Sequence, residues 1–241
     1  MRLALLEDDP TMRESIFTWL TEAGHDLHVH VNARDFMRIA SRESFDLYLL
    51  DSRLPDISGQ EVLQWLRAER GDPTPVVFVT ARSAEEDVVA ALRGGADDYI
   101  VKPVRRAELV ARIEAVLRRV RPEPASAVIE VGCYRFDLAT KTAYMDGEAV
   151  AMTEKEFELA AFMFRNIGRL LSRGHLLESV WGRNPAVATR TIDTHISRVR
   201  GKLELRPERG FRLAPTYNYG YRLEYVDGVD SVTAADAVTS S

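Results

Sequence analysis

The stretch FDLYLLDSRLPDISG, Phe45–Gly59, decides the fold of this chain. Its apolar run Leu47–Leu50 has the length of a strand buried on both faces, and Pro55 and Gly59 mark loop and turn beyond it. Asp51 therefore stands at the C-terminal end of a strand, the edge at which open parallel α/β sheets bind ligands. A single aspartate after a strand is also a common turn or cap residue, so the rest of the chain decides between these interpretations.

Around this strand, the first half of the chain alternates between strand and helix patterns. The predicted strands are Arg2–Leu6, Asp26–Val31, Leu47–Leu50, Val76–Thr80 and Asp98–Val101, and the predicted helices are Thr11–Thr21, Asp35–Ala40, Gln60–Glu69, Ala84–Leu92 and Arg106–Arg119. Five such units in about 120 residues predict a doubly wound, flavodoxin-like parallel sheet of five strands with helices on both faces. His28 and His30 share one face of the second strand, and we expect them to be exposed on a sheet edge.

Length and composition favour two modest domains, because the chain has 241 residues and is 46% hydrophobic. The single cysteine, Cys133, excludes an intramolecular disulfide and a cysteine-built zinc site. The N-terminal MRLALLEDD has too short an apolar run for a signal peptide, and we expect a cytoplasmic protein with no membrane partner. The net charge of −5 argues against uniform affinity for nucleic acid, although a local basic patch is compatible with it.

Polar side chains follow the predicted strands. Glu7, Asp8 and Asp9 follow the first strand, Asp51 the third and Lys102 the fifth, and Thr80 ends the fourth. Acidic side chains that converge at one sheet edge need a cation, and oxygen ligands of this kind suit Mg²⁺ completed by phosphate oxygens. A lysine and a hydroxyl across the cleft would then meet a phosphoryl group.

Four motifs of this half resemble the receiver domain of bacterial two-component response regulators. They are LLEDDP at 5–10, LLDSRLPDISG at 49–59, VTAR at 79–82 and GADDYIVKP at 95–103. The resemblance covers residues 1–121 and implies that Asp51 accepts a phosphoryl group from a sensor histidine kinase. Val104 stands where family members often have phenylalanine, which changes the packing there but not the site.

The resemblance also implies roles for the residues around Asp51. The implied Mg²⁺ ligands are Asp8, Asp51, Glu7 through water and the backbone carbonyl of Arg53. Lys102 would pair with the phosphoryl charge, Thr80 would hydrogen-bond to it, and the rotamer of Tyr99 would report the state. Attack by the carboxylate forms an aspartyl phosphate while the metal and the lysine stabilise the charge. Arginines at Arg53 and Arg82 stand where they could steer or block the water that removes the phosphoryl group.

A symmetric dimer through the predicted fourth and fifth helices is a further implication. The residues at this interface are Val88, Arg93, Asp98, Glu108, Arg112, Glu114 and Arg119. Val88 replaces a basic residue, which leaves Glu108 without its usual partner, and Arg93 and Glu114 carry the reverse of the common signs. Arg93 and Glu114 still have opposite charges, so we expect two copies of this chain to associate. A relative with the common arrangement of charges would face like charges and be repelled.

The second half changes character after RPEPASA, 121–127, which predicts a short semi-stiff linker. Val128–Met152 alternates and turns at Asp146-Gly147, which predicts a small antiparallel sheet. Three predicted helices follow, beginning at the capping box Thr153–Glu156, at Ser172 and at Thr189, and ending near Gly168, Gly182 and Leu203.

The third of these helices has one apolar stripe and a basic outer face. The stripe consists of Ile192, Ile196, Val199 and Leu203. Such a pattern is common on solvated helices, but it also suits a reader of the DNA major groove. Residues 165–212 hold eleven Lys and Arg against four Asp and Glu, and this local excess favours the second interpretation.

The second half also resembles a known domain, on the segments 153–182, 190–203 and GYRLEYV at 220–226. It is similar to the α+β winged helix-turn-helix domain of OmpR/PhoB-type regulators over residues 128–226. The implied base contact is Arg198 with Thr194 and Ser197 beside it, and the implied phosphate contacts are Arg190, Thr191, His195 and Arg200. The wing is one residue shorter than usual and has Asn218 in place of arginine, so we expect a weaker dependence on A·T-rich flanks than relatives show.

These features favour a phosphorylation-controlled transcription regulator, with promoter DNA, RNA polymerase and a second copy of the chain as further partners. A hydrolase that uses Asp51 as nucleophile usually has a second Asp two residues later as general acid, where this chain has Arg53, so we expect no enzyme. A pure adaptor would leave the basic helix unexplained. The expected domains are a receiver at 1–120, a linker at 121–127, a DNA-binding domain at 128–226 and a disordered tail at 227–241.

Overall fold

The structure, a computed structural model, describes residues 1–81, 85–120, 127–182 and 190–226. Internal contacts divide the chain into two compact units, residues 1–126 with 172–183 and residues 127–171 with 184–241. The predicted tail, Arg82 and nearly all of the predicted linker lie outside the described residues.

A parallel sheet in the order β2-β1-β3-β4-β5 forms the centre of the first unit. Its strands are β1 (Arg2–Leu6), β2 (Asp26–His30), β3 (Leu47–Leu50), β4 (Val76–Thr80) and β5 (Asp98–Val101). The helices are α1 (Pro10–Glu22), α2 (Ala33–Ala40), α3 (Gly59–Gln64), α4 (Glu85–Arg93), α5 (Arg106–Val120) and, grouped with this unit, α7 (Arg173–Trp181). The predicted doubly wound, five-stranded sheet is confirmed.

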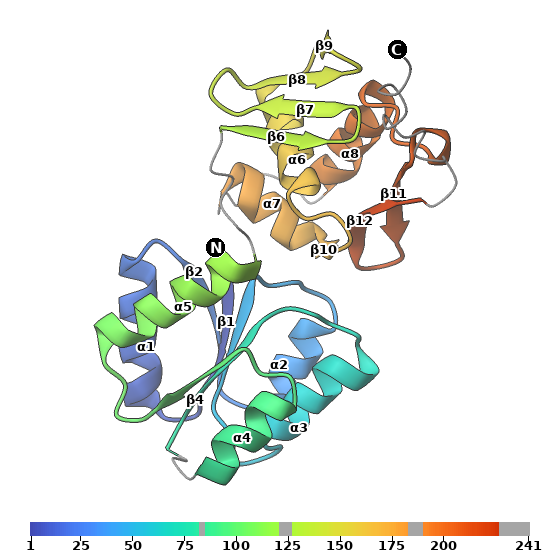
Figure 1. Ribbon diagram of the computed structural model, residues 1–241. Coiled ribbons are helices and arrows are strands. Elements are labelled where there is room, and N and C mark those ends of the chain that lie inside the picture. The colour runs from blue at the N-terminus through green and yellow to red at the C-terminus, as the bar shows by residue number, and fades with distance from the viewer. Residues whose placement is uncertain (82–84, 121–126, 183–189, 227–241) are drawn as a thin grey trace, which may run out of the picture. The chain divides into compact units, whose positions relative to one another are not determined.

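The central strands face a hydrophobic core on each side of the sheet. Leu3 and Leu5 of β1 pack in the core that α1 and α5 cover, whereas Ala4 and Leu6 pack in the core that α2 and α3 cover. Figure 1 shows the two helix layers on either side of the strands. All four side chains are fully buried, and each leucine contributes about 1.5–3 kcal/mol of burial free energy. Burial on both faces explains why these strands are continuous apolar runs.

One predicted helix is irregular. Gln60–Glu69 was expected as a single α-helix, but α3 ends at Gln64 and a π-helical turn, η1 (Trp65–Glu69), completes the segment. A widened turn leaves the apolar spacing almost unchanged, so the helical pattern of the sequence does not reveal it.

In its described residues, the second unit contains two sheets and the helices α6 and α8. The first sheet has the order β6-β7-β8-β9 and the second the order β10-β12-β11. The elements are β6 (Val128–Val131), β7 (Tyr134–Asp137), β8 (Thr142–Met145), β9 (Glu148–Val150), α6 (Glu154–Phe164), β10 (Leu170–Ser172), α8 (Arg190–Lys202), the short 3₁₀ helix η2 (Pro207–Arg209), β11 (Phe211–Thr216) and β12 (Gly220–Tyr225). The strand β10 was not predicted, because three residues are too few to display a period.

The predicted apolar stripe of α8 forms part of the core of the second unit. Its four residues, Ile192, Ile196, Val199 and Leu203, are at most 1% exposed. An aromatic cluster around Tyr134 and Phe164, with ring centroids 5.0 Å apart, continues this core. The buried hydroxyl of Tyr134 donates to the carbonyl of Leu203 at 2.8 Å, which satisfies an unpaired carbonyl group at the end of α8.

Candidate functional site

The polar residues predicted at the strand ends do lie together. Carboxylate oxygens of Glu7, Asp8 and Asp51 are all within 4.8 Å of one another. The order of the sheet explains this, because β1 and β3 are neighbours and their carboxyl ends lie at the same edge. Glu7 is fully buried, Asp51 is 5% exposed and Asp8 is exposed, so the cluster opens to solvent on the side of Asp8.

Lys102 forms ion pairs with the two buried carboxylates. Its Nζ lies 2.6 Å from Asp51 Oδ2 and 2.8 Å from Glu7 Oε2. Burial by itself lowers the pKa of Lys102, but hydrogen bonds to Asp51 and Glu7 outweigh this effect and raise the pKa above its usual range. Burial raises the pKa of Glu7, and the ammonium group offsets part of that shift. The cluster is therefore a set of carboxylates that holds one positive charge already and can accept another.

The backbone after β3 fixes the orientation of Asp51. The amide of Arg53 donates to Asp51 Oδ1 at 3.0 Å, so one carboxylate oxygen is held by the backbone and the other by Lys102. A Cβ added to Gly59 would lie only 2.1 Å from the carbonyl oxygen of Asp51. A side chain at the start of α3 is therefore excluded, and the capping box of Ser58 and Glu61 starts the helix at this point.

Two further residues contact the acidic loop: Asp9, which the sequence analysis placed after the first strand without a role of its own, and Arg13, which it did not select. Asp9 caps α1 by accepting from the amide of Met12 at 2.8 Å, and its own amide donates to Glu7 Oε1. Arg13 donates to the carbonyl of Asp8 at 2.9 Å. These bonds tie the acidic loop to the first turn of α1. An Asp before a helix is the usual cap signal, whereas nothing in the local sequence indicates the contact of Arg13.

Thr80 and Tyr99 lie on the strands next to this cluster. Thr80 is fully buried and forms a hydrogen bond with Ser52, a residue that the sequence analysis did not select. Tyr99 is 8% exposed, and its ring centroid lies 6.1 Å from that of Phe78. The signal for Ser52 was its place directly after Asp51, which a single sequence cannot distinguish from an ordinary loop serine.

The predicted dimer residues lie on α4, β5 and α5. Arg112 contacts Asp98 at 3.3 Å and Glu108 at 3.0 Å. The hydrogen bond to Glu108 has the larger effect, and together the two bonds raise the pKa of Arg112. Glu108 was expected to lack its usual partner, and Arg112 of the same helix provides one. Val88 packs against the core, while the remaining three, Arg93, Glu114 and Arg119, are exposed.

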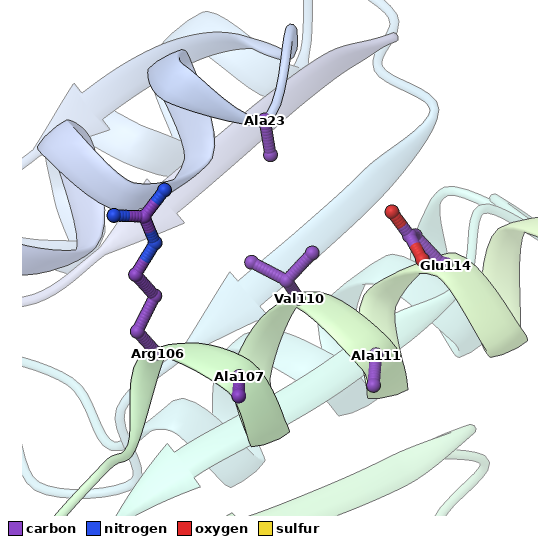
Figure 2. Close-up of a pocket in the computed structure, with 6 residues that line it drawn as sticks. All are labelled: Ala23, Arg106, Ala107, Val110, Ala111 and Glu114. Carbon is purple, nitrogen blue, oxygen red and sulfur yellow. The ribbon is translucent and has the colours of Figure 1, made fainter.

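A shallow hollow of about 430 Å³ lies on the same unit, between the end of α1 and the first turns of α5 (Figure 2). It is lined by Ala23, Arg106, Ala107, Val110, Ala111 and Glu114. Arg106 also pairs with Glu22 of α1 at 2.8 Å. None of the lining residues belongs to the acidic cluster, so the two features are separate.

The basic face of α8 has the predicted arrangement. Thr194, Ser197 and Arg198 are exposed on the side opposite to the apolar stripe. Half-buried residues flank them, and Arg200 among these donates to the carbonyl of Leu213 in β11 at 3.1 Å. The half-buried residues are Thr191, His195 and Arg200. Arg190 begins the helix, but its side chain lies outside the described part.

Glu156 of α6 anchors the basic end of α8. Its carboxylate accepts from Lys202 Nζ at 2.7 Å and lies 3.9 Å from Arg198 Nη1, while it also caps the start of α6. Burial by itself raises the pKa of Glu156, but Lys202 and the cap bonds to Thr153 outweigh it and hold the pKa below its usual range. A charged, 1% exposed carboxylate thus fixes one helix relative to the other.

A doubly wound sheet that gathers carboxylates, a lysine and a hydroxyl at its carboxyl edge defines the class of receiver domains. Comparison with known families agrees: the response regulator receiver domain matches residues 3–114, and the family described as transcriptional regulatory protein, C terminal, matches residues 147–223. The chain therefore belongs to the OmpR/PhoB-type response regulators of two-component systems.

Individual relatives match nearly the whole chain. Sensory transduction protein RegX3 of Mycobacterium tuberculosis is 36% identical over 223 residues, which cover 91% of this chain and 97% of that protein. The DNA-binding response regulator MtrA of Mycolicibacterium smegmatis is 34% identical, with 92% and 96% covered. A solved structure, response regulator DrrB of Thermotoga maritima, is 28% identical with a TM-score of 0.45, and the match covers 93% of this chain and 98% of that one.

The general function of the chain follows from its membership of this family. The chain is a response regulator in which a phosphorylation-controlled receiver is joined to a DNA-binding domain that regulates transcription. Receivers of this kind bind Mg²⁺ at their acidic site, their partners include a sensor kinase and DNA, and the family is not normally enzymatic. Every helix among the described residues is too short or too polar to span a bilayer.

Proposed function

We propose that Asp51 is the residue that accepts the phosphoryl group. In this reaction a carboxylate oxygen of Asp51 attacks phosphorus, the P–N bond to the kinase histidine breaks, and an aspartyl phosphate forms. The observation that carries the proposal is the fixed orientation of the Asp51 carboxylate, with Lys102 at 2.6 Å and two more acidic residues beside it. Lys102 stabilises the charge on the transferred group, and Thr80 donates a hydrogen bond to it.

The acidic cluster also suits a magnesium ion. Its donors are oxygens alone, and one face is exposed, as Mg²⁺ with several retained waters requires. Asp8 and Asp51 would hold the metal directly, Glu7 would hold it through water, and the carbonyl of Arg53 would complete the set. When bound, Mg²⁺ would offset the negative charge on the phosphoryl oxygens. Before metal binds, Lys102 stabilises the same carboxylates.

Phosphorylation in turn controls self-association and DNA binding. The buried ring of Tyr99, next to β4, follows the movement of Thr80, and the surface of α4, β5 and α5 pairs with its equivalent in a second copy. The resulting homodimer presents two copies of α8 to promoter DNA, where Arg198 contacts bases and RNA polymerase is recruited. The protein acts as a cytoplasmic regulator and not as a hydrolase, with the receiver at 1–120, a linker at 121–127, the DNA-binding domain at 128–226 and a disordered tail at 227–241.

The test uses the full chain with acetyl phosphate and Mg²⁺, and separates phosphorylated from unmodified protein on a phosphate-affinity gel. We expect phosphorylation of the parent, complete loss in Asp51→Asn, and retention in Arg198→Ala. In a mobility-shift assay on its own promoter, beryllofluoride should strengthen DNA binding of the parent, whereas Arg198→Ala should lose about 1–3 kcal/mol of binding free energy. Phosphorylation of Asp51→Asn at the parent level would refute the assignment.

A further inference from the structure

Ser52 and Thr80 form a buried pair of hydroxyl groups beside Asp51. Ser52 Oγ and Thr80 Oγ1 share a hydrogen bond, and the two residues are 2% and 0% exposed. The sheet fixes this pairing, because Leu50 lies opposite Phe78 in the register of β3 and β4, and Ser52 and Thr80 keep the same offset two residues further on. Ser52 lies two residues beyond the end of β3, so the contact continues the strand register into the start of the following loop.

Side-chain alternation in β4 places Thr80 on the same face of the sheet as Phe78. Residues two apart on a strand share a face, so Thr80 lies on the face of Phe78, against which Tyr99 packs. Asp51 and Ser52 follow the last residue of β3, and the carboxylate of Asp51 is held separately by the amide of Arg53 and by Lys102. Ser52 therefore holds the hydroxyl of Thr80 on the side of Tyr99.

We infer that Ser52 is a positioning residue that keeps Thr80 in the resting arrangement. The inference rests on the proposed role of Thr80 as donor to the phosphoryl group on Asp51. To form that bond, Thr80 turns its hydroxyl away from Ser52, and the buried hydroxyl of Ser52 loses this partner. An interaction made in only one of two states shifts the equilibrium toward that state, so Ser52 sets the threshold of the switch.

Ser52→Val and Ser52→Thr provide a matched test, because their side chains have nearly the same shape and differ in the hydroxyl. The measurement is the NMR signal of the Thr80 methyl group in the full chain, with and without beryllofluoride and Mg²⁺. Without the phosphoryl mimic, we expect Ser52→Val to raise the population of the active arrangement about tenfold and Ser52→Thr to behave as the parent. At saturating mimic all variants should converge, because the bond between Ser52 and Thr80 is absent there.

Equal resting populations in Ser52→Val and Ser52→Thr would overturn the inference. A lower active population in Ser52→Val at saturating mimic would also overturn it, because Ser52 would then support the active state. Ser52→Ala, which adds no volume, replaces Ser52→Val if the larger side chain prevents folding. A parent whose Thr80 signal does not respond to the mimic would instead contradict the proposed function of Asp51, so the two failures are distinguishable.

Discussion

At the scale of single residues, His30 shows how burial changes a side chain's chemistry. We expected it to be exposed on a sheet edge, and β2 is indeed an edge strand. The side chain is only 7% exposed, however, because its ring packs edge-on against Phe36 with centroids 5.6 Å apart and its Nδ1 lies 3.1 Å from Asp35. Burial lowers the pKa of His30, and the carboxylate of Asp35 offsets part of this shift.

A lowered pKa makes the stability of the first unit depend on pH. As the pH falls below about 6.5, the unfolded chain takes up a proton at His30 before the folded chain does, so acid lowers the free energy of unfolding until the folded pKa is reached. We expect His30→Gln to flatten this dependence between pH 7.5 and 5.5. The pH dependence of the free energy of unfolding is measured by hydrogen exchange of the β1 and β3 amides in the full chain.

Asp35→Asn is the companion variant. It removes the carboxylate that raises the pKa of His30, so the loss of stability in acid should become steeper than in the parent. A slope that stays the same in both variants would show that His30 does not set the pH dependence.

At the scale of elements, the start of α3 determines the backbone around Asp51, the proposed phosphoacceptor. Gly59 is the first residue of this helix, and its missing side chain lets the helix approach the carbonyl of Asp51. The amide of Gly59 also donates to the carbonyl of Ser52 at 3.2 Å. The position of Asp51 thus depends on a contact between backbone segments that only glycine permits.

Gly59→Ala should therefore destabilise the first unit by about 1–3 kcal/mol, because the helix has to move away from Asp51. We expect phosphorylation of Asp51 to slow as well. Gly201→Ala in α8 is the matched control, since nothing lies within 4 Å of a Cβ there, and alanine in a helix should be neutral or stabilising by up to about 1 kcal/mol. Urea denaturation measures the unfolding midpoints of Gly59→Ala and Gly201→Ala. Equal midpoints for the two variants would contradict the steric argument.

At the scale of the whole molecule, the proposed dimer surface on α4, β5 and α5 carries charges that would select its partner. Asp98, Glu108 and Arg112 are already paired within the chain, whereas Arg93 and Glu114 are exposed. Exposed pairs contribute only about 0–1 kcal/mol each, so their effect is on the choice of partner more than on affinity. In the proposed dimer, the reversed charges of Arg93 and Glu114 would favour a second copy of this chain over a relative with the common arrangement of charges.

Charge reversal tests this selection. With beryllofluoride bound, Arg93→Glu should weaken the homodimer by about fivefold because two acidic residues then face each other, and the double variant Arg93→Glu with Glu114→Arg should restore it. The double variant should also form heterodimers with a conventional relative, which the parent resists. Sedimentation of mixed samples measures both effects. Ready heterodimers of the parent would contradict the proposed role of Arg93 and Glu114.

The wing differs from the usual pattern of the family at Asn218. Asn218 replaces the usual arginine, and its φ of 55° shows that it occupies the left-handed conformation that asparagine tolerates well. The turn between β11 and β12 requires this conformation at position 218, which favours asparagine there. The neighbouring side chain of Tyr217 is 91% exposed. The weaker dependence on A·T-rich flanks stays a prediction.

The amino-acid sequence by itself determined the order and type of nearly all elements and the residues at the strand ends. Local periodicity marks buried strands and amphipathic helices, and a parallel sheet places all carboxyl ends at one edge, so Glu7, Asp51 and Lys102 could be assigned to one site. Only the tertiary structure decided the contacts within that site. The bond between Ser52 and Thr80, the approach of Gly59 to Asp51 and the burial of His30 depend on strand register and side-chain packing between distant segments, which no local pattern encodes.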